Sequence, residues 1–171
     1  EVRGMTWDEI HVFNEEEAQR RGYFGIWQIP ARRMKSRRDH RVPLTHEMIG
    51  LIRGNNERDG LIFPSSKGTP ISDMTMSALM KRMHKSDSIG FVDAKSNKPT
   101  VPHGLRSTFR DWVAENNQSR EAAELQLAHK FGSALEHTYY RTDLIDQRAK
   151  LLDNWVQFLK NADVSEDGKN D

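Results

Sequence analysis

The chain has 171 residues, of which 36% are hydrophobic and 30% are charged, and it contains no cysteine. A chain of this length fits one domain with a substantial core. The lack of cysteine excludes a disulfide framework, thiolate catalysis and a cysteine zinc site. No apolar stretch approaches the roughly 20 residues of a membrane-spanning helix, and the first residues lack the apolar segment of a signal peptide. We therefore expect a cytoplasmic protein.

The net charge is only +1, but basic residues are concentrated in one short segment. Between residues 32 and 41 the single acid Asp39 stands among the cations Arg32, Arg33, Lys35, Arg37, Arg38 and Arg41. A polyanion would meet a strongly basic patch on a nearly neutral protein. A solvated loop explains the same pattern about as well, because charge patterning alone is a weak indicator of function.

Strands are predicted on both sides of this basic segment, over residues 26–30 and 40–44, and another within the first thirteen residues. Together they predict a small three-stranded antiparallel sheet. Lys35 then lies on the turn of a hairpin or just before it, where it can project into a groove. The polar residues 14–22 are predicted to form a loop.

From residue 45 onward the spacing of apolar residues becomes helical, and Thr45 is a suitable N-cap. In chain order, helices are predicted over 45–54, 73–83, 102–116 and 119–128, then a short helix with the tyrosines, then 143–160. The polar residues 162–171 are expected to form a disordered tail. The sequence therefore predicts an α+β fold that is mostly α-helical.

The second half of the chain carries residue types that suit phosphate chemistry. His103 and Arg106 share a face at a predicted helix start, where free backbone N–H groups and the helix dipole attract a phosphate. His129 follows the next helix, and Tyr139 and Tyr140 come shortly after it. A phenol among fixed cations suits attack on a phosphodiester. Each residue alone has a structural explanation too, such as capping, ion pairing or packing.

A metal site built from His103, His129 and His137 is a competing interpretation. Zinc sites draw on histidine, cysteine and carboxylate ligands, typically at short, regular spacing. No carboxylate or cysteine stands at such spacing beside these histidines. We therefore expect no metal.

Four segments in one order resemble the tyrosine recombinases, and among them the integrases of phages, satellite phages and genomic islands. They are Arg32-Arg33-Met34-Lys35 with His40-Arg41-Val42-Pro43-Leu44, His103-Gly104-Leu105-Arg106, Leu127-Ala128-His129, and Tyr139-Tyr140-Arg141. The resemblance extends from Thr6 to Trp155. It implies a recombinase catalytic core over residues 1–161 and site-specific DNA recombination through a 3′-phosphotyrosyl intermediate.

The resemblance also implies roles for single residues. Tyr139 would be the nucleophile, preferred over Tyr140 because it stands two residues before Arg141. Arg106 would clamp the phosphate and His129 would donate to it. His103 would bind the phosphate or take the tyrosine proton, and Lys35 would protonate the leaving 5′-oxygen. From the charge of the basic segment we further expect contacts with the DNA backbone from Arg32, Arg33, Arg37, Arg38 and Arg41.

The same resemblance implies double-stranded attachment sites as partners, a homo-tetramer on DNA for the full-length protein, and accessory DNA-bending proteins. It implies that the reaction needs neither a metal nor ATP. It also implies that the protein acts at the bacterial nucleoid. The family's first catalytic arginine precedes a segment like Glu1-Val2-Arg3-Gly4, so we expect a truncated catalytic domain that cleaves DNA poorly.

Two alternatives to a recombinase stay open at the level of sequence: a DNA-binding module with this fold and no chemistry, and a type IB topoisomerase with the same chemistry. The role of the last helix is open as well. The last helix either packs its apolar face on its own domain or docks on a neighbouring protomer.

Overall fold

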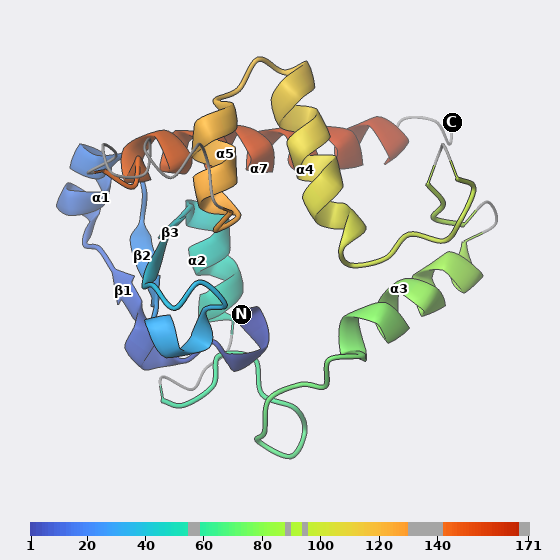
Figure 1. The fold of residues 1–171 in the computed structure, drawn as a ribbon, viewed down its shortest axis with the longest axis horizontal. Helices are drawn as coiled ribbons and strands as arrows, with labels where there is room; N and C mark the ends of the chain where they lie inside the picture. The colour runs from blue at the N-terminus through green and yellow to red at the C-terminus, as the bar shows by residue number, and fades with distance from the viewer. Residues whose placement is uncertain (55–58, 88–89, 94–95, 130–141, 168–171) are drawn as a thin grey trace.

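The computed structural model describes residues 1–54, 59–87, 90–93, 96–129 and 142–167, with side chains up to residue 161. In these residues a small antiparallel sheet lies at one side of a set of helices, and α7 runs behind the others from the sheet side toward α4 (Figure 1). The predicted fold class, mostly helical with a three-stranded antiparallel sheet, is confirmed.

The sheet has the order β1-β2-β3, formed by β1 (Ile10–Val12), β2 (Gly25–Ile29) and β3 (His40–Leu44). Trp27 in β2 stands opposite residue 10 of β1 and residue 42 of β3. Along β2 the residues alternate between buried and more exposed, as expected for a strand with one face on the core. The strands predicted around the basic segment are therefore correct.

The predicted loop over residues 14–22 is wrong, because this segment forms helix α1 (Glu15–Arg21). Its only buried residue is Ala18, so the segment carries no apolar periodicity that would reveal a helix. The ends stabilise it instead: the Asn14 side chain accepts a hydrogen bond from the backbone N–H of Glu17, and Gly22 ends the helix with φ at +78°. Acids in the first turn and arginines in the last turn also suit the helix dipole.

The other helices that the structure describes agree with the sequence in place and order, whereas the predicted short helix with the tyrosines lies outside the described residues. Thr45 caps α2 and Ser119 caps α5 through their side-chain oxygens, as polar N-cap residues do. The bounds are α2 (His46–Arg53), α3 (Thr75–Ser86), α4 (Gly104–Glu115), α5 (Arg120–Gln126) and α7 (Ile145–Asp167), and short 3-10 helices cover Val2–Gly4, Trp7–Glu9 and Ala31–Arg33. Helix α7 thus extends past residue 160 into the segment that was expected to be a tail.

Two hydrophobic clusters form the core. One lies under the sheet and comprises Met5, Trp27, Ile29, Met34, Leu44, Ile49, Ile52 and Ile62. The other joins α4, α5 and α7 and comprises Phe109, Trp112, Val113, Ala122, Ala123 and Leu151. The apolar face of α7 therefore packs on its own domain around Leu151 and Leu152, while Phe158 remains 43% exposed.

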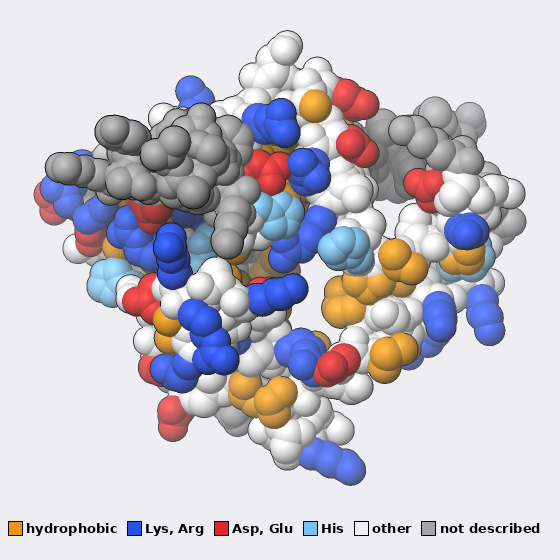
Figure 2. Space-filling model, viewed as in Figure 1, with side chains coloured by type: hydrophobic (Ala, Val, Ile, Leu, Met, Phe, Trp, Pro, Cys, Tyr) orange, Lys and Arg blue, Asp and Glu red, His pale blue; other side chains and the backbone are white. Residues whose placement is uncertain are grey.

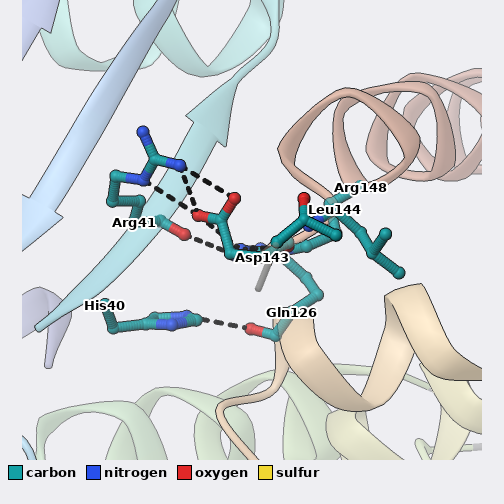
Figure 3. Close-up of polar contacts among 7 residues, drawn as sticks. His40, Arg41, Gln126, Asp143, Leu144 and Arg148 are labelled. Atoms are coloured by element: carbon teal, nitrogen blue, oxygen red, sulfur yellow. Dashed lines mark hydrogen bonds and ion pairs between the residues drawn. The ribbon is translucent and has the colours of Figure 1, made fainter. Parts of the chain in front are cut away.

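A buried arginine joins the two clusters. Arg148 on α7 is 1% exposed, and its Nε donates to the side-chain oxygen of Gln126 at 3.0 Å (Figure 3). Its Nη1 donates to the Asp143 backbone carbonyl at 3.3 Å, and its Nη2 donates to the backbone carbonyl of Arg41 on β3. Burial lowers the pKa of Arg148 to about 10, against the opposing effect of the Asp143 carboxylate, so the side chain stays charged at neutral pH. This arginine clamp, Arg148 with its three acceptors, ties β3, α5 and α7 together.

Replacing Arg148 with Met should lower the free energy of unfolding by roughly 3 kcal/mol or more, because buried acceptors would lose their donor. Chemical denaturation measures this change. The matched control is Arg41→Gln, which removes the exposed ion pair with Asp143 but keeps the Arg41 carbonyl, and should cost under about 1 kcal/mol. Equal losses in the two variants would contradict a central role for the buried guanidinium.

Candidate active site

The basic segment between β2 and β3 is anchored at several points, which limits where Lys35 can lie. Met34, the residue before Lys35, is 5% exposed and belongs to the sheet cluster. Arg33 forms an ion pair with the buried carboxylate of Glu9, which also accepts a hydrogen bond from the indole N–H of Trp27 at 3.0 Å. Lys35 itself is exposed, so an exposed cation stands directly beside an anchored residue.

The arginines of this segment fall into two groups. Arg33 is held by Glu9, and Arg41 makes two hydrogen bonds of 2.8 Å to the Asp143 carboxylate. The side chains of the remaining three, Arg32, Arg37 and Arg38, are exposed. Figure 2 shows Lys and Arg side chains over the sheet half of this face and around its central hollow, with histidines between them.

The structure brings Arg106 and His129 together, although they come from different elements. Arg106 lies in the first turn of α4, and its Nη1 donates to the Leu127 backbone carbonyl at 3.0 Å. The same nitrogen lies 3.3 Å from Nε2 of His129. His103 directly precedes the first residue of α4 and is exposed. The guanidinium and one imidazole therefore meet, with the second imidazole at the N-terminus of the same helix.

The turn after α5 places His129. Ala128 has φ at +55°, the left-handed conformation that usually ends a helix in a Schellman motif. The backbone N–H of His129 donates to the Glu124 carbonyl at 2.9 Å, and that of Ala128 donates to the Leu125 carbonyl at 3.1 Å, which are the two bonds of this motif. Ala128 also packs against the sheet cluster. The helix end thus fixes the direction in which the chain presents His129.

Sequence reasoning missed Glu124, which the structure places at the centre of the site. Its carboxylate is buried at 8% exposure, and Oε2 lies 2.7 Å from Nδ1 of His129. Oε1 forms an ion pair of 2.8 Å with Nη2 of Arg110, one turn after Arg106 on α4. The sequence offers one weak signal, an acid directly after the buried pair Ala122 and Ala123, and this does not distinguish a buried acid from an exposed one.

A cavity of about 650 Å³ lies between α4 and α5 on the Arg110 side of this acid. Its lining includes Arg110, Arg120 and Glu124, but neither Arg106 nor His129. The buried carboxylate therefore stands between the cavity and the Arg106–His129 contact.

His40 links β3 to the end of α5. Its Nε2 lies 3.3 Å from the backbone carbonyl of Gln126, so this nitrogen donates to the carbonyl (Figure 3). Burial, and next the charge of Arg148, lower the pKa of His40 below its ordinary value of 6.5. The neutral ring and the arginine clamp together join the strand after the basic segment to the helix before His129.

The two candidate nucleophiles, Tyr139 and Tyr140, both fall in residues 130–141, which the structure does not describe. Among the residues it does describe, no cluster of three or more His, Asp or Glu side chains suits a metal ion. In the same part of the chain, no helix combines the length and the apolar character needed to cross a membrane.

Comparison of the sequence with known protein families identifies the family of this chain. The sequence model of the phage integrase family matches residues 1–144. This chain belongs to the phage integrase family. The resemblance to tyrosine recombinases in its motifs is thereby confirmed at the level of the family.

The relatives of this phage integrase family member are themselves integrases. The chain is 33% identical to prophage integrase IntA of Escherichia coli K12 over 95% of its own length and 36% of the relative. It is 25% identical to the integrase of Shigella phage Sf6, over 93% of the chain and 37% of that protein, and 24% identical to prophage integrase IntS of E. coli K12 over the same shares. The chain therefore spans about a third of the length of these relatives. No solved structure matches it significantly.

The lowered pKa of His40 predicts acid sensitivity. The unfolded chain binds a proton at this histidine near pH 6.5, whereas the folded protein binds it only at lower pH. The stability that His40 contributes is therefore present above pH 6.5 and is lost as the pH falls through and below that value. In a His40→Gln variant, which keeps a donor for the Gln126 carbonyl, the free energy of unfolding should fall less steeply between pH 7 and pH 5. Denaturant titrations at several pH values measure the two slopes, and identical slopes would refute the prediction.

Proposed function

We propose that this chain is the catalytic part of a site-specific DNA recombinase that cuts and rejoins DNA by tyrosine transesterification. The observation that carries the proposal is the meeting of Arg106 and His129. Helix α4 and the turn after α5 bring a guanidinium and an imidazole to one place, and such fixed groups suit the stabilisation of a phosphoryl group. Membership of the phage integrase family and similarity to prophage integrases support the same conclusion.

In the proposed reaction the phenol oxygen of Tyr139 attacks the phosphorus of one DNA strand, and His103 takes the phenol proton. The bond from phosphorus to the 5′-oxygen breaks, and Lys35 gives the leaving oxygen its proton. The product is a 3′-phosphotyrosyl ester with a free 5′-hydroxyl. Attack by a 5′-hydroxyl reverses the sequence, so the ester preserves the bond energy for rejoining.

Arg106 is proposed to hold the non-bridging phosphate oxygens. A guanidinium has donors on three nitrogens, and within the described residues Arg106 uses Nη1 for its contacts with Leu127 and His129. Nε and Nη2 are then the donors for a phosphate, which they can bind in a bidentate manner. His103 is proposed to reach the same phosphate from the start of α4, where free backbone N–H groups add to the attraction.

The proposed DNA contacts extend the site along the basic segment. The exposed set Arg32, Arg37 and Arg38 would bind backbone phosphates together with Lys35, and Arg41 and Arg33 would do so while held by their acids. We propose residues 1–161 as the catalytic domain, double-stranded attachment sites as its DNA partner, and a tetramer of the full-length protein on DNA with accessory DNA-bending proteins. The proposed place of action is the bacterial nucleoid.

The covalent step is tested with nicked duplexes of randomised sequence, which trap the tyrosyl ester because the cleaved end diffuses away. A covalent protein–DNA adduct should accumulate slowly, because we expect this chain to cleave DNA poorly, and mass spectrometry should place the DNA on Tyr139. Tyr139→Phe should abolish the adduct and keep DNA affinity, because it removes one hydroxyl and no cation. Tyr140→Phe is the matched control and should retain the adduct.

An adduct that persists in Tyr139→Phe and disappears in Tyr140→Phe would move the nucleophile by one residue. DNA binding with no adduct in the unsubstituted chain would favour a binding module. Relaxation of supercoiled plasmids irrespective of their sequence would favour the topoisomerase.

Neutralising Arg37 and Arg38 together should weaken binding to all DNA sequences alike. Each lost phosphate contact reduces the slope of log affinity against log salt by about 0.9, so the double Gln variant should lose nearly two units. Fluorescence anisotropy at several salt concentrations measures the slope. Arg20→Gln on α1 is the control for a general loss of charge and should leave the slope unchanged. A loss confined to particular sequences would contradict an assignment to the DNA backbone.

A further inference from the structure

We propose that Glu124 is a positioning residue, which holds His129 in one tautomer and, through it, orients Arg106 before any phosphate binds. The part of this proposal that concerns phosphate rests on the proposed function above. The part that concerns the tautomer rests only on the contacts of Glu124, His129 and Arg106.

The tautomer follows from the partners on the two ring nitrogens. An ionised carboxylate only accepts hydrogen bonds, so Nδ1 of His129, at 2.7 Å from Glu124 Oε2, carries a proton. A guanidinium only donates, so Nε2, at 3.3 Å from Nη1 of Arg106, presents its lone pair. Both partners require the same neutral form of His129, with its proton on Nδ1.

The carboxylate that selects this tautomer is itself fixed. Its other oxygen accepts from Arg110 at 2.8 Å, and its side chain is buried against α4. An ion pair of this kind keeps a buried acid charged and oriented. Glu124 also accepts the backbone N–H of His129 through its own carbonyl. The same residue thus holds both the main chain and the ring of His129.

The resulting chain of contacts runs Arg110–Glu124–His129–Arg106 and begins and ends on α4. Arg106 and Arg110 are one turn apart on that helix, and α5 with its terminal turn supplies the two residues between them. Nε2 of His129, together with the Leu127 carbonyl, holds the Arg106 Nη1 in a defined place. The guanidinium therefore needs little reorganisation when a phosphate arrives, which is how preorganised donors lower a barrier.

The same arrangement explains how His129 can become a donor to the phosphate. Once the phosphate takes over the contact with Arg106, Nε2 accepts a proton from a solvent hydronium ion, which becomes water, and points an N–H at the phosphate oxygen. The Glu124 carboxylate, still bonded to Nδ1–H, balances the positive charge of the ring. Glu124 touches neither the DNA nor the phosphorus, so its effect passes through His129.

The tautomer is tested directly by long-range proton–nitrogen NMR of His129 in the 171-residue chain at neutral pH without DNA. The expected result is a proton on Nδ1. Glu124→Leu should shift the ring to the other tautomer or a mixture, whereas Glu124→Gln should retain Nδ1–H because its amide oxygen still accepts. Glu121→Leu, on the same helix with no bond to His129, is the matched control and should change nothing.

Adduct formation on the nicked duplexes gives the functional readout. Misplacing a residue that orients a catalytic histidine slows the reaction, so Glu124→Leu should form the adduct about 10- to 100-fold more slowly. Glu124→Gln should recover part of this loss, and Glu121→Leu should match the unsubstituted chain.

A ring protonated on Nε2 in the unsubstituted chain would overturn the inference even if no variant folds. So would an unchanged tautomer and rate in a folded Glu124→Leu variant. If the unsubstituted chain forms no adduct while its ring carries the proton on Nδ1, the proposed function fails and the positioning of His129 stands.

Discussion

The candidate site has two halves, the basic segment and the Arg106–His129 pair, and one buried guanidinium contacts the elements that carry both. Arg148 donates to the backbone of β3, to the Gln126 side chain at the end of α5, and to the backbone carbonyl of Asp143, two residues before α7 begins. The basic segment precedes β3, and His129 follows α5. Each half has its own hydrophobic cluster. The clamp around Arg148, the His40–Gln126 hydrogen bond and the packing of Ala128 together set the basic segment and the Arg106–His129 pair in a defined relation.

The sequence predicts the elements that depend on local rules. The strands on both sides of the basic segment lie where they were predicted, and Thr45 caps the helix that it was expected to cap. Ser119 caps the helix that was predicted to begin at that residue. It does not predict α1, whose stability comes from its ends rather than from an apolar face. It also does not reveal Arg148 and Glu124 as buried, because hydrophobic patterns rank both residue types as exposed, and only tertiary partners make their burial tolerable.

The sequence predicts only part of the candidate site, because the partners that support its residues depend on tertiary packing. The motif residues Arg106 and His129 were named from the sequence, and the structure brings them within 3.3 Å of each other. The sequence did not predict the residues that support this pair. The left-handed backbone of Ala128 and the contact of the Glu124 carboxylate with His129 both depend on how the end of α5 packs against α4. Arg33 and Arg41 show the converse case. Both belong to the basic segment, and both also form ion pairs that help to hold the fold.

The chemistry of the Arg148 clamp has an evolutionary consequence. Two of its three acceptors are main-chain carbonyls, at positions 41 and 143, which every amino acid possesses. The side chain at position 41 can therefore vary among descendants without withdrawing an acceptor from the guanidinium, whereas the Asp143 carboxylate also balances its buried charge. Position 41 lies in the segment proposed to bind the DNA backbone, so a lineage can alter the overall strength of DNA binding there while the clamp keeps its acceptor.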